Sequence, residues 1–168
     1  MAEYNKAYQI KTIKYSGLFN INKVHKFLIE WIKQNGFIMY EEMTQEQVFT
    51  NEKQLIYNYK PYKKFTDFAK AVIYLDVSMN NITDVTIEED NKKKKMQKGN
   101  IEISVTGFIE TDYENKWETK PFYYFLKIVF EKFFLGGHRS YYESFVKKSC
   151  QTLYEDIKAM LNIHSLKV

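Results

Sequence analysis

The sequence predicts an α+β fold with an antiparallel sheet of about six strands, a helix after the first strand, and two C-terminal helices packed on the sheet. Apolar residues recur with a helical period near both ends of the chain, and they alternate with polar residues through the middle. Only 6 Gly and 2 Pro occur among 168 residues, which favours regular elements joined by short loops. Because no linker rich in Gly, Pro or Ser interrupts the chain, we expect a single domain over residues 1–168.

The stretch AYQIKTIKYSGLF, residues 7–19, is predicted to open with a strand that ends at Gly17. The segment that follows is predicted to be a helix, since its apolar residues fall on one helical face. Asn20 or Asn22 can cap the first turn, and Gly36 stands where a left-handed stop is favoured. The expected apolar face comprises Val24, Phe27, Leu28, Trp31 and Ile32.

A period of two then predicts several strands. Residues 37–49 and 53–60 are expected to form two of them. Residues 70–79 and 100–110 alternate most clearly, which indicates strands with one buried face and one solvated face. The side chains expected on the buried face are those of Ala71, Ile73, Leu75, Val77, Met79, Ile101, Ile103, Val105 and Ile109.

Charged residues in this region are predicted to be solvated. The stretch VTIEEDNKKKKMQKGN, residues 85–100, is interpreted as a shorter strand and a long hairpin turn. Its lysines suggest an anion-binding patch, but the acidic residues just before them largely cancel the local charge. Asp76, Glu102 and Glu110 fall on the polar face of their strands, where they are expected to favour solubility rather than acid–base chemistry.

Residues 121–135 form the most apolar stretch of the chain and are predicted to be a helix that starts near Thr119 and Pro121. Its polar residues form one narrow stripe, so such a helix must be covered on more than one side. The cover can come from the monomer itself, from a second subunit, or from a lipid surface. Gly136 and Gly137 are expected to end this helix.

The last helix is predicted to begin at Ser140, because Ser140 and Glu143 have the spacing of a capping box. We expect the helix at residues 121–135 to lie between the sheet and this last helix. The apolar face of the last helix is expected to comprise Val146, Cys150, Leu153, Ile157 and Met160.

No motif for catalysis, metal binding or cofactor binding is recognisable. The three His and one Cys lack metal-ligand spacing, and no phosphate-binding glycine motif occurs. Cys150 falls on an apolar helix stripe, which favours a core residue over a nucleophile. We therefore predict a protein that is not an enzyme, has no cofactor and holds no metal; an enzyme site assembled from scattered residues is the weakest alternative.

The basic residues argue against specific nucleic-acid recognition. The net charge is +4, but Arg139 is the only arginine among 25 basic residues, and lysine lacks the bidentate fork that reads base edges. No stretch approaches the roughly 20 apolar residues of a membrane-spanning helix. The N-terminal residues show no apolar signal region, so a cytoplasmic protein is expected.

Several stretches resemble those of known proteins. YSGLF (residues 15–19) leads into the helix that contains Trp31, and KKKKMQKGNIEI (residues 92–103) precedes DYENKW (residues 112–117). This layout resembles a group of small archaeal proteins of unknown function, and the resemblance implies an archaeal cytoplasmic protein without implying an activity. The order of elements is also similar to START-like helix-grip domains, in which a curved sheet wraps the last helix and often encloses an apolar ligand.

Aromatic residues make up 17% of the chain, which favours a protein-interaction function. Interfaces concentrate aromatic side chains because these bury a large area at low entropic cost. The leading prediction is therefore a homo-oligomer or a protein that docks a protein partner. The residues expected at this surface are Phe122, Phe125, Val129, Phe133, Phe134, Tyr141 and Tyr142. The alternative is a carrier of an apolar small molecule, in a pocket lined by Ile73, Leu75, Val77, Ile103 and Val105.

Overall fold

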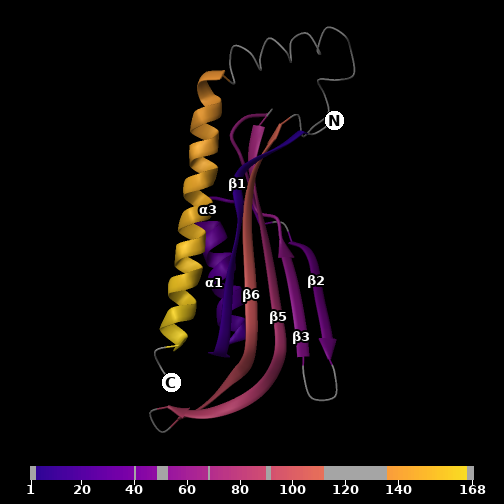
Figure 1. Cartoon of the computed structure of the whole chain (residues 1–168), viewed down its shortest axis with the longest axis vertical. Helices are drawn as coiled ribbons and strands as arrows, with labels where there is room; N and C mark the ends of the chain where they lie inside the picture. The colour runs from indigo at the N-terminus through magenta and orange to yellow at the C-terminus, as the bar shows by residue number, and fades with distance from the viewer. Residues whose placement is uncertain are drawn as a thin grey trace.

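The computed structural model describes residues 3–39, 41–48, 53–67, 69–89, 92–111 and 136–165. Over these residues the chain has an α+β fold with an antiparallel sheet and helices, as predicted (Figure 1). The elements are β1 (Glu3–Phe19), α1 (Ile21–Gln34), β2 (Glu41–Val48), β3 (Lys53–Tyr59), β4 (Tyr62–Lys64), β5 (Ala69–Glu89), β6 (Lys92–Thr111) and α3 (Gly136–Ser165). The predicted helix at residues 121–135 lies outside the described residues.

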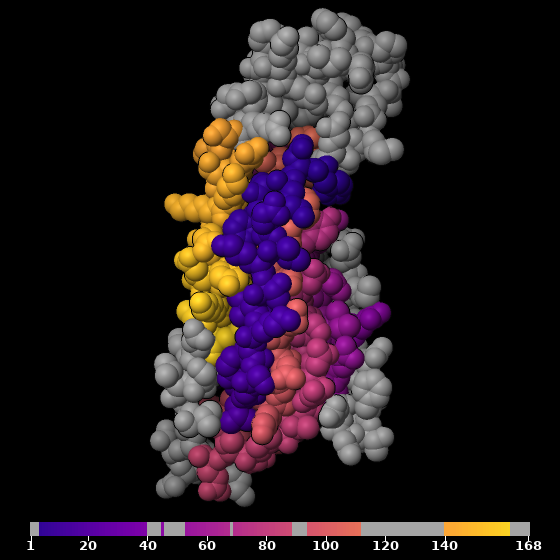
Figure 2. Space-filling model, in the orientation of Figure 1, coloured from indigo at the N-terminus to yellow at the C-terminus, as the bar shows by residue number. Residues whose placement is uncertain are grey.

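The sheet joins the first strand of the chain to the last. Its order is β1-β6-β5-β3-β2, and the short β4 pairs with β5 outside this order. Figure 1 shows α1 and α3 beside the sheet, and Figure 2 shows β1 on the surface between α3 and β6. The indole Nε1 of Trp31 in α1 donates a hydrogen bond to Asp156 Oδ2 in α3 at 2.8 Å, so the two helices are also joined to each other.

The first strand and the first helix follow the sequence closely, with one correction. Asn20 caps α1 by accepting a hydrogen bond from the Lys23 backbone N–H at 3.0 Å, and Gly36 ends the helix region with φ 72°. The strand does not end at Gly17, however. It continues to the buried Phe19, because β6 supplies pairing partners that far, with Gly17 opposite Gly99.

Residues 85–100 are predicted to form a shorter strand and a long turn. The strand is confirmed, because β5 continues to Glu89, but the long turn is wrong, because β6 already begins at Lys92. Glu88 of β5 stands opposite Lys93 of β6, and Glu89 stands opposite Lys92. Backbone pairing thus continues to the residues next to the turn, and the lysine run belongs to β6. The far end of this long hairpin curves toward the helix side of the molecule (Figure 1).

The alternation within β5 and β6 places the predicted side chains in the core, where all nine have 5% exposure or less. The polar face differs from the prediction at Glu110. Its side chain is only 7% exposed and forms an ion pair with Lys70 Nζ at 3.0 Å. A carboxylate with a close cation can be buried, whereas an unpaired one cannot, and strand alternation alone does not reveal that partner.

The last helix is longer than predicted. It begins at Gly136, so Ser140 lies within the helix and is not its cap. Two glycines cost about 1 kcal/mol each in a helix, but packing against a sheet outweighs such propensities. The predicted residues Val146, Cys150, Leu153 and Ile157 are buried; Met160 is only partly buried and packs against the core, whereas Leu161 completes the buried stripe.

The helix α3 lies directly on the sheet at Gly107 of β6. A Cβ atom at this glycine would stand 2.6 Å from Val146 Cγ1 and 2.7 Å from Cys150 Sγ. Only a residue without a side chain permits such an approach. The expected sandwich, with another helix between α3 and the sheet, is therefore wrong at this crossing.

We expect Gly107→Ala to destabilise the fold by about 1–3 kcal/mol, because the added methyl group overpacks the contact with α3. Urea unfolding followed by circular dichroism measures this change as a lower midpoint. The double variant G107A/V146A should lose less than the sum of the two single variants, since the shorter side chain at residue 146 makes room. Additive losses would show that the contact at Gly107 is not tight.

Candidate functional site

Aromatic rings gather around the N-terminal half of α3. Phe65 stacks on Tyr142 with ring centroids 4.4 Å apart and planes 12° apart, and it meets Phe145 edge-on at 5.3 Å. Phe145 lies 6.2 Å from Phe37, and Tyr141 lies 5.9 Å from Tyr142. We call these five residues the aromatic array. They bring together the end of α1, the turn between β4 and β5, and α3.

Local backbone structure holds each contributor in place. The Phe37 N–H donates to the carbonyl of Ile32 at 3.0 Å, just after the left-handed Gly36. The Phe65 N–H donates to the carbonyl of Ala69 at 3.0 Å, which closes the turn before β5. Tyr141, Tyr142 and Phe145 share one flank of α3, because residues three or four positions apart are neighbours on a helix.

The array extends from the core to the solvent. Phe37 is buried and belongs to the core cluster, while Phe65, Tyr142 and Phe145 are partly buried against it. Tyr141 is 63% exposed. The Lys63 Nζ lies 5.1 Å from the Phe145 ring centroid and 6.0 Å from that of Phe37, within the range of a cation–π contact.

A second group of rings lies on the opposite face of the sheet, but lysines cover it. Tyr74 and Phe108 meet edge-on at 5.0 Å, and Tyr4 joins Phe108 at 6.4 Å. Lys60 Nζ lies 4.7 Å from the Tyr74 centroid, and Lys6 Nζ lies 5.8 Å from that of Phe108. Lys63 approaches the aromatic array in a similar way, but Tyr141 of the array is 63% exposed, against 47% for Tyr4, so the array offers the more open ring to another protein.

The predicted interface residues divide between described and undescribed parts of the chain. Tyr141 and Tyr142 both belong to the aromatic array. The other five, Phe122, Phe125, Val129, Phe133 and Phe134, lie outside the described residues. Sequence reasoning missed Phe37, Phe65 and Phe145. A signal existed only for Phe145, which follows Tyr141 and Tyr142 at helical spacing.

The residues predicted to line an apolar pocket do come together. Ile73, Leu75, Val77, Ile103 and Val105 each have 0% or 1% exposure and belong to one core cluster with residues of α1 and α3. An apolar ligand at this position would share the space with the packed helices. The carrier hypothesis stays a prediction.

The described residues offer few groups for chemistry. Among them, no group of three or more His, Cys, Asp or Glu is placed to hold a metal ion. His25 Nδ1 lies 2.6 Å from Tyr59 Oη, and the His25 ring also contacts Tyr57. Burial raises the pKa of the Cys150 thiol to about 12, so the thiolate needed for nucleophilic attack is scarce near neutral pH. Neither described helix is long and apolar enough to cross a membrane.

Comparisons with protein-family models, curated proteins and solved structures give no significant match to this chain. The fold therefore defines the class, an α+β protein with two helices beside an antiparallel sheet, and no family is assigned. The resemblances to small archaeal proteins and to START-like domains stay predictions.

The native Cys150 thiol should not react with Ellman's reagent at pH 8, whereas the urea-unfolded chain should react at once. The raised pKa also predicts a pH dependence of stability. Between pH 9 and pH 12 the unfolded chain loses this proton and the native protein keeps it, so the free energy of unfolding falls as pH rises.

The contribution of this thiol is at most about 1.4 kcal/mol per pH unit. It can be isolated by urea unfolding of the wild type and of Cys150→Ala at several pH values, since the other titrating groups are common to both. The difference in free energy of unfolding between the two proteins should decline above pH 9. A constant difference, or fast native labelling, would show that the thiol is accessible.

Proposed function

We propose that this chain is a non-enzymatic interaction protein that associates with a second copy of itself through the aromatic array. The observation that supports this proposal is the stack of Phe65 on Tyr142, which continues outward to a Tyr141 that is 63% exposed. Tyrosine and phenylalanine at the centre of a partly buried patch are typical of interface anchors.

The array is suited to binding because its rings are already held. Phe65 contacts both Tyr142 and Phe145, and Phe37 joins the array to the core. Side chains fixed in this way lose little rotational freedom when a partner covers them. More of the binding free energy from buried aromatic area then remains as affinity.

A second copy is the partner that matches the chemistry of this surface. In a twofold-symmetric contact, the same patch meets itself. The Lys63 ammonium lies beside the array, at the rings of Phe37 and Phe145. Two copies can therefore supply ring–ring and cation–ring contacts to each other. The Lys63 charge then needs no carboxylate on the partner, because the partner's rings can contact it. The proposal treats the protein as cytoplasmic, in keeping with its sequence.

Light scattering coupled to size exclusion should give a discrete mass that is a multiple of 20.2 kDa for the wild type. Tyr141→Asp should shift this mass to that of the monomer, because it places a carboxylate among the rings. Its effect on stability should stay within about 0.5 kcal/mol, as is usual for an exposed position.

Ile10→Asp is the matched control, since Ile10 is 59% exposed but lies on β1, outside the array. This variant should keep the mass of the wild type. A wild type that stays monomeric up to millimolar concentration would contradict the proposal. If both variants dissociate the oligomer equally, the added negative charge alone explains the dissociation, and the array is not the interface.

A further inference from the structure

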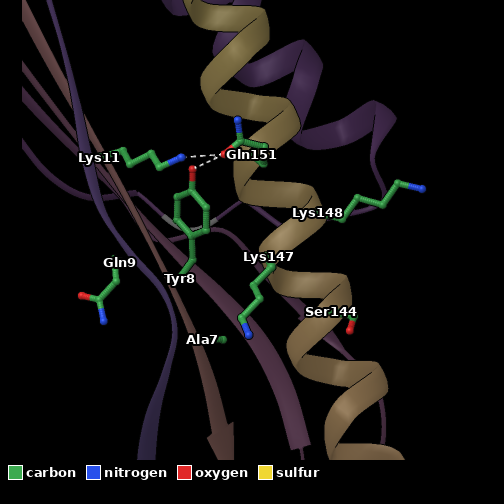
Figure 3. A pocket seen from close by; sticks show the side chains of 8 residues that line it. All are labelled: Ala7, Tyr8, Gln9, Lys11, Ser144, Lys147, Lys148 and Gln151. Carbon is green, nitrogen blue, oxygen red and sulfur yellow. Dashed lines mark hydrogen bonds between the residues drawn. The ribbon is translucent and has the colours of Figure 1, made fainter.

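A groove with a volume of about 650 Å³ lies between β1 and α3 (Figure 3). By helical spacing, its residues Lys147 and Gln151 lie on the other flank of the buried stripe of α3 from Tyr142 and Phe145. The groove is open to solvent, and its volume falls within the range of small-molecule sites. Tyr8 and Lys11 line it from β1, and Ser144, Lys147, Lys148 and Gln151 line it from α3. Neither the core nor the proposed docking surface accounts for this groove.

The charged side chains that line the groove are lysines only, as far as the described residues show. Lys11, Lys147 and Lys148 line it without an aspartate or glutamate. Figure 3 shows Lys147 extending into the space between α3 and β1, and Lys148 extending away from β1. The acidic neighbour of Lys147 is Glu143, one helical turn away, at an Nζ–Oε2 distance of 3.9 Å. An exposed pair at this distance is weak, and Glu155, which accepts a hydrogen bond from Gln151, does not line the groove, so the lysine ammonium groups are the charges that face a bound anion.

Hydrogen bonds hold one of these ammonium groups in position. Lys11 Nζ donates to Gln151 Oε1 at 2.8 Å, and the Tyr8 hydroxyl donates to the same oxygen at 2.8 Å (Figure 3). The Gln151 amide is itself oriented, because its Nε2 donates to Glu155 Oε1. Lys11 Nζ also lies 5.3 Å from the Tyr8 ring and 5.4 Å from the Tyr154 ring. An ammonium group has three N–H donors, and the hydrogen bond to Gln151 uses one of the three donors of Lys11.

We propose that this groove binds a phosphate group attached to an apolar body, with Lys11 and Lys147 as its charged partners. Lysine acts on phosphate as a point charge and needs no bidentate geometry, which suits two ammonium groups reaching the groove from different elements. The aliphatic stems of the lysines, together with Ala7 and Tyr8, provide an apolar wall for the rest of the ligand. Both a soluble phosphomonoester and the headgroup of an anionic phospholipid have this chemistry.

Phenyl phosphate is a suitable probe, and amide chemical shifts of the full-length ¹⁵N-labelled protein give a site-resolved readout. We expect saturable shifts confined to the groove segments of β1 and α3, and none with phenol. Lys11→Gln and Lys147→Gln should each weaken binding about tenfold, as expected for one charge-assisted hydrogen bond. All of these lysines are exposed, so the variants should fold.

Lys158→Gln is the matched control, because it removes the same charge from an exposed position of α3 that does not line the groove. It should change the affinity by less than twofold. Co-sedimentation with phosphatidylcholine vesicles containing phosphatidic acid separates the two sources of the phosphate. Vesicle binding that Lys147→Gln abolishes, without binding of phenyl phosphate, would assign the groove to a lipid headgroup.

Three results would overturn the proposal. They are the absence of saturable binding to both phenyl phosphate and the vesicles, shifts that spread over the whole surface, and a loss of affinity in Lys158→Gln equal to that in Lys147→Gln. The dissociation of the oligomer in Tyr141→Asp is independent of each of them, so the two proposals can fail separately.

Discussion

The close approach of α3 to β6 at Gly107 is the contact on which the rest of the structure depends. Gly107 stands opposite Tyr8 of β1 and Ile73 of β5, so the contact lies where three strands meet beneath one helix. A side chain here would collide with Val146 and Cys150, and also with Tyr8, whose Cβ would be only 3.1 Å away. The absence of a side chain at Gly107 thus determines how closely α3 can pack against the sheet.

The contact of α3 with the sheet at Gly107 also positions Tyr8, which stands opposite Gly107 and lines the groove. The pairing of β1 with β6 has register shifts on both sides of Tyr8, between Lys6 and Tyr8 and between Tyr8 and Lys11. Bulges re-aim side chains and bend the strand that contains them. Here Tyr8 is 8% exposed and reaches Gln151 on α3, while Lys11, after the second shift, meets the same amide oxygen.

The sequence predicts the parts of the fold that depend on periodicity, and it misses those that depend on partners far along the chain. Alternation identified the buried side chains of β5 and β6, and helical spacing identified Val146, Cys150, Leu153 and Ile157. The lysine run was misjudged because the sequence places acidic residues just before it but does not reveal that the two runs pair as neighbouring strands. Phe65 could not be predicted for a similar reason, since a ring in a short turn has no period and its stacking partner is Tyr142.

Helical geometry separates the buried stripe of α3 from the two surfaces that we propose bind a partner and a ligand. Each residue advances about 100° around the axis, so positions three and four apart return to one stripe. The buried stripe contains Val146 and Cys150; the aromatic residues Tyr142 and Phe145 lie on one flank of it, and Lys147 and Gln151 lie on the other. The buried stripe therefore supplies the packing against the sheet, and the residues on the two flanks are not needed for it. The outer residues of both flanks are exposed to solvent. Substitutions there can alter either surface without disturbing the buried contact at Gly107 that holds the helix in place.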